Sequence, residues 1–220
     1  MKGDEFVAKL LAGERDFRRI KLEKGYDLSA HENYGGLRSF LVNSKDDLKE
    51  NPVKLVGADL SYLTAPDLYL HHTKAAGAVF KHANFSKSTF DYADFSNASL
   101  DHTDLQGTYF RTATLEGASL FAANLINSYL TFTNLKFANL SCANLYTALL
   151  QGANLCGTDF ERADLSEADL RGAKNLGAAK LSKAYFLETQ ISRNDLAVVK
   201  QALKSQKRLV YDGFFEHYFK

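Results

Sequence analysis

Cysteine, proline and tryptophan are scarce in this chain. Its 220 residues include two cysteines, two prolines, one methionine and no tryptophan. Two cysteines are too few for a disulfide scaffold, so Cys142 and Cys156 are expected to be free thiols. No apolar run approaches the length of a membrane span, and residues 1–14 are too charged for a signal peptide. We therefore expect a soluble, cytoplasmic protein with no membrane partner.

An excess of either charge is also absent, because 27 Lys and Arg residues are balanced by 26 Asp and Glu residues. A protein that binds nucleic acid directly usually carries a basic stripe, which is missing here. The sequence also lacks a glycine-rich phosphate loop, a nucleophile elbow, a paired-cysteine zinc spacing and a calcium loop. We therefore predict no enzymatic activity, no catalytic residue, no cofactor and no metal site.

What the sequence does contain is a repeat of five residues, from Val53 to Gly172. Each repeat is written i−2 to i+2, with i at every position divisible by five. From residue 75 to 170, nineteen of twenty i positions are Leu or Phe, and all twenty i−2 positions are Ala, Ser or Thr. Side chains two apart point the same way on an extended chain, so both face the core. A helix is excluded because a period of five drifts off any helical face.

Glycine marks where each repeat turns. Seven glycines lie between residues 53 and 172, and each is at i+2, where a positive φ is often needed. Four such corners close a square, which predicts coils of twenty residues stacked as parallel strands about 4.8 Å apart. Residues twenty apart then become vertical neighbours, which places the undersized Ala65 and Ala75 next to Phe85 and Phe95.

The same spacing makes neighbours of two histidines, His82 and His102. Imidazoles stacked one coil apart could share a transition metal. Two solvated surface histidines are the simpler interpretation, and it is the one we favour.

Repeats such as GADLS, YADFS, AANLI, CANLY and RADLS resemble the A(D/N)LXX motif of pentapeptide-repeat proteins. The resemblance implies that family's fold, an all-β solenoid in the form of a right-handed quadrilateral parallel β-helix. We expect about seven coils, with short α-helical caps at the N- and C-termini. The resemblance implies little about function, because family members share the scaffold and differ in partner.

The chain is interpreted as a single domain, residues 1–220. Within an N-terminal cap of residues 1–14, residues 4–12 are predicted to be helical, with Asp4 as the N-cap and Gly13 as the stop. Residues 15–22 form a first partial coil, with Phe17 and Leu22 at i. Residues 23–52 lose the five-residue phase and are predicted to be an insertion in which Ser44 caps a turn or two of helix. Whether the insertion carries function or is merely tolerated stays open.

Coils are predicted for residues 53–192, with a one-residue slip at 173–174. The count then restarts at Leu176, Leu181, Phe186 and Ile191. Ser192–Gln206 has helical periodicity, with Ser192 or Asn194 as the cap and an apolar stripe of Leu196, Val199 and Leu203. Residues 193–220 are predicted to cover the last coil or, as the family resemblance allows, to form a homodimer contact through Phe214, Phe215, Tyr218 and Phe219, and both could hold.

The middle of the chain is poor in charge, since residues 117–158 contain no acidic residue and one basic residue, Lys136. Exposed aromatics beside an arginine in such a region are typical of protein-binding hot spots. We predict a neutral aromatic face for an unidentified protein partner, formed by Tyr92, Tyr109, Arg111, Phe121, Tyr129, Phe132, Phe137, Tyr146 and Leu149. The alternative is that these aromatics only stabilise the coils by packing on each other.

Two functions are consistent with these features. The first is a non-enzymatic, rigid scaffold for protein–protein interaction in a regulatory role. The second is implied by the resemblance, because the family's quinolone-resistance members mimic duplex DNA and occupy DNA gyrase. Mimicry of DNA needs a strongly acidic face, and the near-neutral charge of this chain disfavours it.

Overall fold

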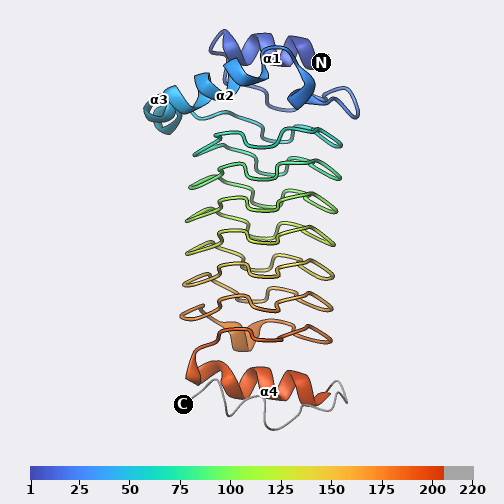
Figure 1. Ribbon diagram of the computed structural model, residues 1–220, viewed down its shortest axis with the longest axis vertical. Coiled ribbons are helices and arrows are strands. Elements are labelled where there is room, and N and C mark those ends of the chain that lie inside the picture. The colour runs from blue at the N-terminus through green and yellow to red at the C-terminus, as the bar shows by residue number, and fades with distance from the viewer. Residues whose placement is uncertain (206–220) are drawn as a thin grey trace.

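The computed structural model describes residues 1–205, with side chains through residue 202. Figure 1 shows a rod of stacked flat coils with helices at both ends. Helices α1 (Gly3–Leu11), α2 (Tyr34–Asn43) and α3 (Lys45–Glu50) lie at the N-terminal end, and α4 (Leu196–Ser205) lies at the other. Short 3-10 helices occupy Leu28–Ala30, Leu176–Ala178 and Arg193–Asp195. No helix within residues 1–205 is long and apolar enough to cross a membrane.

Backbone pairing between coils repeats every twenty residues. Each i−1 residue forms a parallel bridge with the i−1 residue of the next coil, as Asn84 does with Asp104 and Asn124 with Asn144. Only one residue on each side of a coil pairs in this way. The described chain therefore has isolated parallel bridges and no longer strand, and the predicted twenty-residue coil is confirmed.

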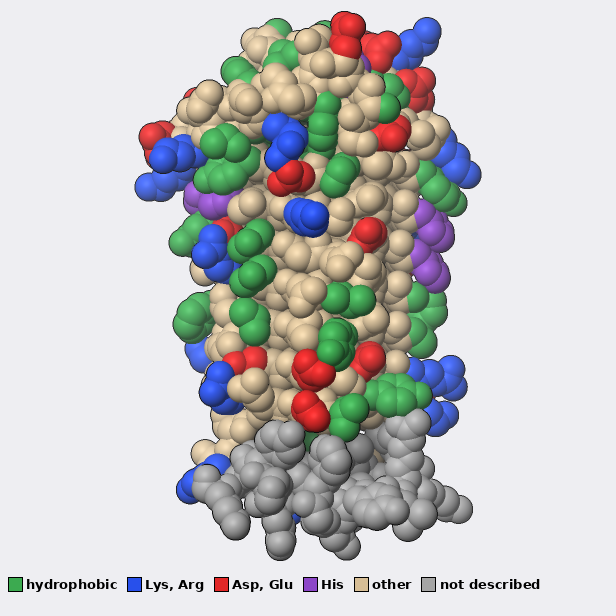
Figure 2. Space-filling view, viewed as in Figure 1, with side chains coloured by type: hydrophobic (Ala, Val, Ile, Leu, Met, Phe, Trp, Pro, Cys, Tyr) green, Lys and Arg blue, Asp and Glu red, His purple; other side chains and the backbone are tan. Residues whose placement is uncertain are grey.

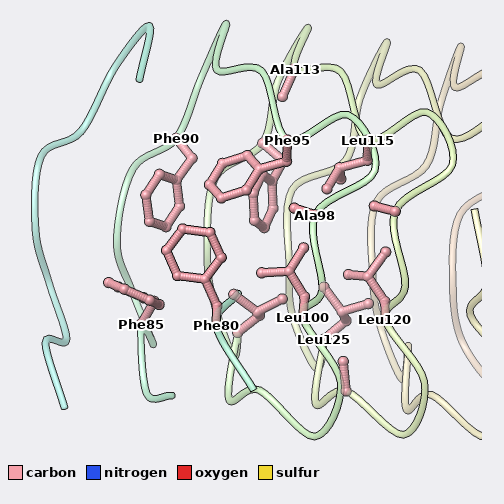
Figure 3. Packing of buried hydrophobic residues seen from close by; sticks show 14 of the residues in the cluster. Phe80, Phe85, Phe90, Phe95, Ala98, Leu100, Ala113, Leu115, Leu120 and Leu125 are labelled. Atoms are coloured by element: carbon pink, nitrogen blue, oxygen red, sulfur yellow. The ribbon is translucent and has the colours of Figure 1, made fainter. Parts of the chain in front are cut away.

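The five-residue phase decides which side chains are buried. Leu120 and Leu140 superpose one coil apart and are fully buried, and Ala143 at i−2 is 1% exposed. Figure 3 shows the rings of Phe80, Phe85, Phe90 and Phe95 packed together inside the coils. The rings of Phe90 and Phe95 meet edge to face with centroids 5.0 Å apart. The predicted inward positions are confirmed, and burial of apolar side chains stabilises the stack.

The corners of the coil require the left-handed backbone conformation. Every i+2 residue from Gly57 to Gly172 has φ between 54° and 71°, whether or not it is glycine. This conformation costs roughly 1–2 kcal/mol for a residue with a Cβ. At most of these corners an N–H group donates to a carbonyl of the next coil, as that of Tyr92 does to the carbonyl of Arg111 at 3.0 Å. These hydrogen bonds between coils offset the local strain.

The start of α1 differs from the prediction. The helix begins at Gly3 with Lys2 as the N-cap, so the assignment of Asp4 as N-cap was wrong. Asp4 lies in the first turn, where its carboxylate accepts a hydrogen bond from Tyr26 Oη at 2.7 Å. The predicted stop at Gly13 is confirmed, because Gly13 has φ +87° and its N–H donates to the carbonyl of Leu10.

The first coil extends further than the sequence indicated. Phe17 and Leu22 are buried at i as expected, but Asp27 also bridges Thr64, and Leu28 is fully buried. The interruption therefore begins after Leu28 rather than at residue 23. This side of the coil was not predicted, because Leu28 follows Leu22 by six residues instead of five.

Helices α2 and α3 take the place of the fourth side of the first coil. They cover the core with Leu37, Leu41 and Leu48, all fully buried. Ser44 precedes α3 as expected, but its side chain makes no capping hydrogen bond. Helix α2 was not predicted from the sequence, because its first turn contains Gly35 and Gly36, which favour a loop.

The C-terminal slip lies at Asn175, one residue after the predicted position. The bridge spacing changes there from twenty residues (Asn154 with Lys174) to twenty-one (Asp159 with Lys180), and Asn175 has φ 61°. The count restarts as predicted, with Leu176, Leu181 and Ile191 buried and Phe186 partly buried.

Helix α4 starts later than predicted, at Leu196, after a 3-10 turn. Neither Ser192 nor Asn194 caps it with its side chain, and Ser192 Oγ instead accepts a hydrogen bond from the N–H of Gly172 at 2.9 Å. Val199 of α4 is buried in the same core as the coils. The described residues do not include the side chain of Leu203 or residue Gln206. They also do not include the predicted dimer contacts Phe214, Phe215, Tyr218 and Phe219.

Candidate protein-binding face

The rod has four sides, which we name by their bridge columns. Side A carries the column from Asp59 to Lys180, side B that from Thr64 to Tyr185, side C that from Tyr69 to Gln190, and side D that from Lys54 to Lys174. Each i+1 residue lies on the same side as its i−1 residue, and each i+2 residue forms the corner that follows.

The nine residues predicted to form one aromatic face lie on four sides. Phe121 is on side A, Tyr146 is on side B, and Phe137 is at the corner after side D. The other six gather on side C and its following corner: Tyr92, Tyr109, Arg111, Tyr129, Phe132 and Leu149. The structure therefore brings together six of the nine residues, because a step of five residues leads to the next side of the square.

A stack of two tyrosines forms the centre of side C. The rings of Tyr109 and Tyr129 are parallel, with centroids 4.3 Å apart, and Leu149 follows one coil below. The guanidinium of Arg111 lies 5.4 Å from the Tyr109 ring centroid. Burial, together with the neighbouring Tyr129, raises the pKa of Tyr109 above its ordinary value of 10.0, so the hydroxyl remains neutral at physiological pH.

Arg111 is held by a buried carboxylate. Asp91, directly above it and 1% exposed, accepts hydrogen bonds from Arg111 Nε at 2.9 Å, from Nη2 at 2.6 Å and from the Arg111 N–H at 2.8 Å. These hydrogen bonds raise the pKa of Arg111. The pair adds no net charge to the face, but the guanidinium remains half-exposed and fixed in direction.

Further aromatic stacks extend side C toward the N-terminal end. The rings of Tyr69 and His71 lie 4.2 Å apart, and those of His72 and Tyr92 lie 5.1 Å apart. His71 Nε2 is 3.7 Å from the carboxylate of Asp91, but burial lowers the pKa of His71. Sequence reasoning missed these residues. Spacings in multiples of twenty residues, forty from Tyr69 to Tyr109 and twenty from His72 to Tyr92, could have shown them.

A groove of about 550 Å³ lies between α2 and the top of side C. Gly35, Ser39 and Val42 line it from the helix, and Tyr69 and Thr89 line it from the coils. On its edge, Arg38 of α2 bonds to the carboxylate and carbonyl of Asp67. The sequence did not indicate this groove, because α2 was not predicted.

Charge is low in the middle of the rod. Figure 2 shows a band near mid-height where hydrophobic side chains are visible and charged ones are few, between more charged regions above and below. Phe132 is 68% exposed and Tyr92 is 52% exposed, so both present large apolar area to solvent. The described part of the chain thus carries an aromatic, nearly uncharged surface on side C.

The histidines His82 and His102 stack with Tyr62 at the corner after side A. Their rings are parallel within 6°, with centroids 4.9 Å apart, and Tyr62 lies 4.9 Å from His82. Within residues 1–205, no group of three His, Cys, Asp or Glu residues is placed to hold a metal ion. Cys142 and Cys156 are both free, as predicted.

The comparisons with known proteins follow this geometry. A family model described as pentapeptide repeats matches within residues 67–174, in the stretches 67–107, 78–117, 118–148 and 143–174. Four-sided coils with inward Leu or Phe every five residues define a β-solenoid, and the chain belongs to the pentapeptide-repeat family. No curated protein matches the sequence.

Solved structures that are similar to this chain include the following two. A trypsin-treated variant of QnrB1, a plasmid-mediated fluoroquinolone resistance protein, has 20% identity and a TM-score of 0.55 over 69% of this chain and 83% of that protein. HetL from Nostoc sp. strain PCC 7120, a protein involved in regulating heterocyst differentiation, has 24% identity and a TM-score of 0.44 over 86% of this chain and 94% of that protein. At this identity, the likeness to QnrB1 concerns the fold alone.

Proposed function

We propose that this protein is a rigid, non-enzymatic module that binds another protein through side C, in a regulatory role. The observation that carries the proposal is the Tyr109–Tyr129 stack beside Arg111, whose charge is matched by the buried Asp91. Tyrosine and arginine are the residues most enriched in binding hot spots. Here they stand in a region of the sequence with almost no other charge.

Pre-organisation of these side chains supports the proposal. Tyr109 is fixed by its stack with Tyr129, and Arg111 is fixed by three hydrogen bonds to Asp91. Side chains that are already ordered lose little entropy when a partner binds, so more of the contact energy appears as affinity. Tyr92 and Phe132, which are more exposed, supply apolar area at the edge of the same surface.

The alternative of DNA mimicry is less well supported. A mimic needs a continuous acidic surface, but two of the acids near the C-terminal end are each paired with a base. Asp169 pairs with Arg171 at 2.5 Å, and Asp159 pairs with Lys180 at 3.2 Å. A DNA gyrase supercoiling assay separates the two functions, since inhibition by the purified protein is expected only from a DNA mimic.

The experiment that tests side C is affinity capture with matched variants. Tyr92→Ala/Tyr129→Ala removes aromatic surface from side C, whereas Tyr146→Ala removes an exposed aromatic from side B. Proteins captured from a lysate of the source cells are identified by mass spectrometry, and circular dichroism checks that each variant is folded. We expect a partner retained by the parent and by Tyr146→Ala to be lost from the double variant. Equal capture by all three proteins would contradict the proposal.

A further inference from the structure

Side D differs from the aromatic side C in being smooth. Its outward i+1 positions and corners include Ala76, Gly77, Gly117, Cys156 and Gly157. Its exposed large hydrophobic side chains are Val56, which is 38% exposed, and Phe137 at the corner, which is 59% exposed. A flat surface of small residues with one projecting ring is suited to close contact with another flat surface.

The only charges in the middle of side D form a neighbouring pair. Between Asp94 and Lys174, its outward positions carry just Glu116 and Lys136, one coil apart. Lys136 Nζ lies 3.7 Å from Glu116 Oε1, and both side chains are about two-fifths exposed (39% and 42%). The pair therefore presents a negative and a positive charge in sequence along the rod axis.

We propose that side D is self-complementary and that two copies of this chain associate through it as an antiparallel dimer. The two-fold axis is perpendicular to the rod axis and lies midway between the levels of Glu116 and Lys136. It therefore places each Lys136 against Glu116 of the second copy. The same rotation brings Phe137 to the Gly117 corner of the second copy, where the glycine has no side chain of its own and the amide of Asn97 lies against it. Both contacts occur twice, as a two-fold interface requires.

The order of the charges selects this arrangement. A parallel pairing in the same register would place Lys136 on Lys136 and Glu116 on Glu116, which is repulsive. In the antiparallel arrangement one like-charge contact remains, because Lys74 faces Lys174 of the second copy. These residues are exposed and lie at the two ends of the interface, where salt screens their repulsion.

The size of side D indicates a weak dimer. Six bridge steps from Lys54 to Lys174 give a length of about 29 Å at 4.8 Å per coil. Five residues span at most about 18 Å, so the side offers less than the roughly 800 Å² per partner of a standard interface. We expect association with a dissociation constant on the order of tens of micromolar. The dimer does not depend on side C or on the C-terminal tail.

A disulfide provides a test of both the face and the register. The two-fold axis places Ser96 opposite Cys156 of the second copy, and both are partly exposed. Within one chain these positions are three coils apart, about 14 Å, which is too far for a disulfide. In a Cys142→Ser background, Ser96→Cys should therefore form covalent dimers under mild oxidation at high protein concentration. Ser86→Cys on side B is the matched control and should not.

Charge reversal provides the second test, read by sedimentation velocity over a range of concentrations. Lys136→Glu places like charges at the centre of the interface and should abolish the dimer, whereas Glu116→Lys/Lys136→Glu restores opposite pairs and should recover it. The proposal is supported if the restored variant dimerises and Ser96→Cys crosslinks. It is overturned if the parent is monomeric at several hundred micromolar, if dimers persist unchanged in Lys136→Glu, or if Ser96→Cys crosslinks no more than Ser86→Cys.

Discussion

The ring of Phe132 occupies the space in which a side chain at Gly152 would begin. A Cβ placed on Gly152 would lie 2.5 Å from Phe132 Cδ1. Phe137 and Gly157, at the next corner of the same two coils, have the same relationship. At these two corners the phenylalanine ring thus leans over the corner of the following coil, so a side chain at Gly152 or Gly157 would collide with it. This coupling links sequence positions that are distant in the chain.

Gly152→Ala should therefore be more costly than the same change at an open corner. Gly152 and Gly77 both have positive φ (71° and 64°), but nothing lies within 4 Å of a Cβ at Gly77. We expect Gly77→Ala to lower the free energy of unfolding by roughly 1 kcal/mol and Gly152→Ala by roughly 2–3 kcal/mol. Urea denaturation measures both, and Phe132→Ala should remove the difference. Equal losses in the two single variants would contradict the coupling.

Arg111→Ala should destabilise the protein by leaving a buried carboxylate without its side-chain donors. Asp91 would keep only the hydrogen bond from the residue 111 N–H, while His71 lies 3.7 Å away. Since Arg111 is half-exposed, we expect a moderate loss of about 1–3 kcal/mol. Asp91→Ala/Arg111→Ala should lose less than the sum of the single changes. Additive losses in denaturation experiments would mean that the pair is not coupled.

The free energy of unfolding should depend on pH through His71 and His72. Burial lowers both pKa values below the ordinary 6.5, against the opposing effect of Asp91 on His71 and of Glu50 on His72. The unfolded chain then binds protons at higher pH than the folded one. Stability should therefore be greatest above pH 6.5 and fall as the pH decreases toward the lowered pKa values.

The variant His71→Gln/His72→Gln should show a smaller fall in stability across this range. Thermal unfolding at about pH 7.5 and about pH 5.5 measures the difference for the parent and the variant. The remaining histidines are unchanged in the variant, so the comparison isolates these two imidazoles. An identical pH dependence in the two proteins would show that these imidazoles are not buried in the neutral form.

The coils could be predicted from the sequence because their signal is local and repeated. Leu or Phe at i and a small residue at i−2 must both face the axis, and bridges such as Asn84 with Asp104 follow from counting twenty residues. The left-handed corners were also indicated, since glycine collects at i+2. Regular alternation over many repeats leaves a single way to bury the large side chains.

The ends and the candidate site were harder to predict because they depend on contacts between distant residues. The extra residue before Leu28 concealed one side of the first coil, and Gly35 and Gly36 concealed α2. The nine aromatic-face residues were grouped by their place in the sequence, although Phe121 and Tyr146 turn onto other sides. Equivalent positions on one side of the rod are separated by multiples of twenty residues. Applying this rule to the sequence would have placed Phe121 and Tyr146 on sides other than side C.

The most direct test of the five-residue phase compares two adjacent positions, Ala143 and Asn144. Ala143 is 1% exposed in a small inward slot, whereas Asn144 lies outward in the ladder of side B. We expect Ala143→Phe to lower the free energy of unfolding by at least about 3 kcal/mol, and Asn144→Phe by less than about 1 kcal/mol. Equal losses in urea denaturation would contradict the assignment of inward and outward positions on which the proposed binding surfaces depend.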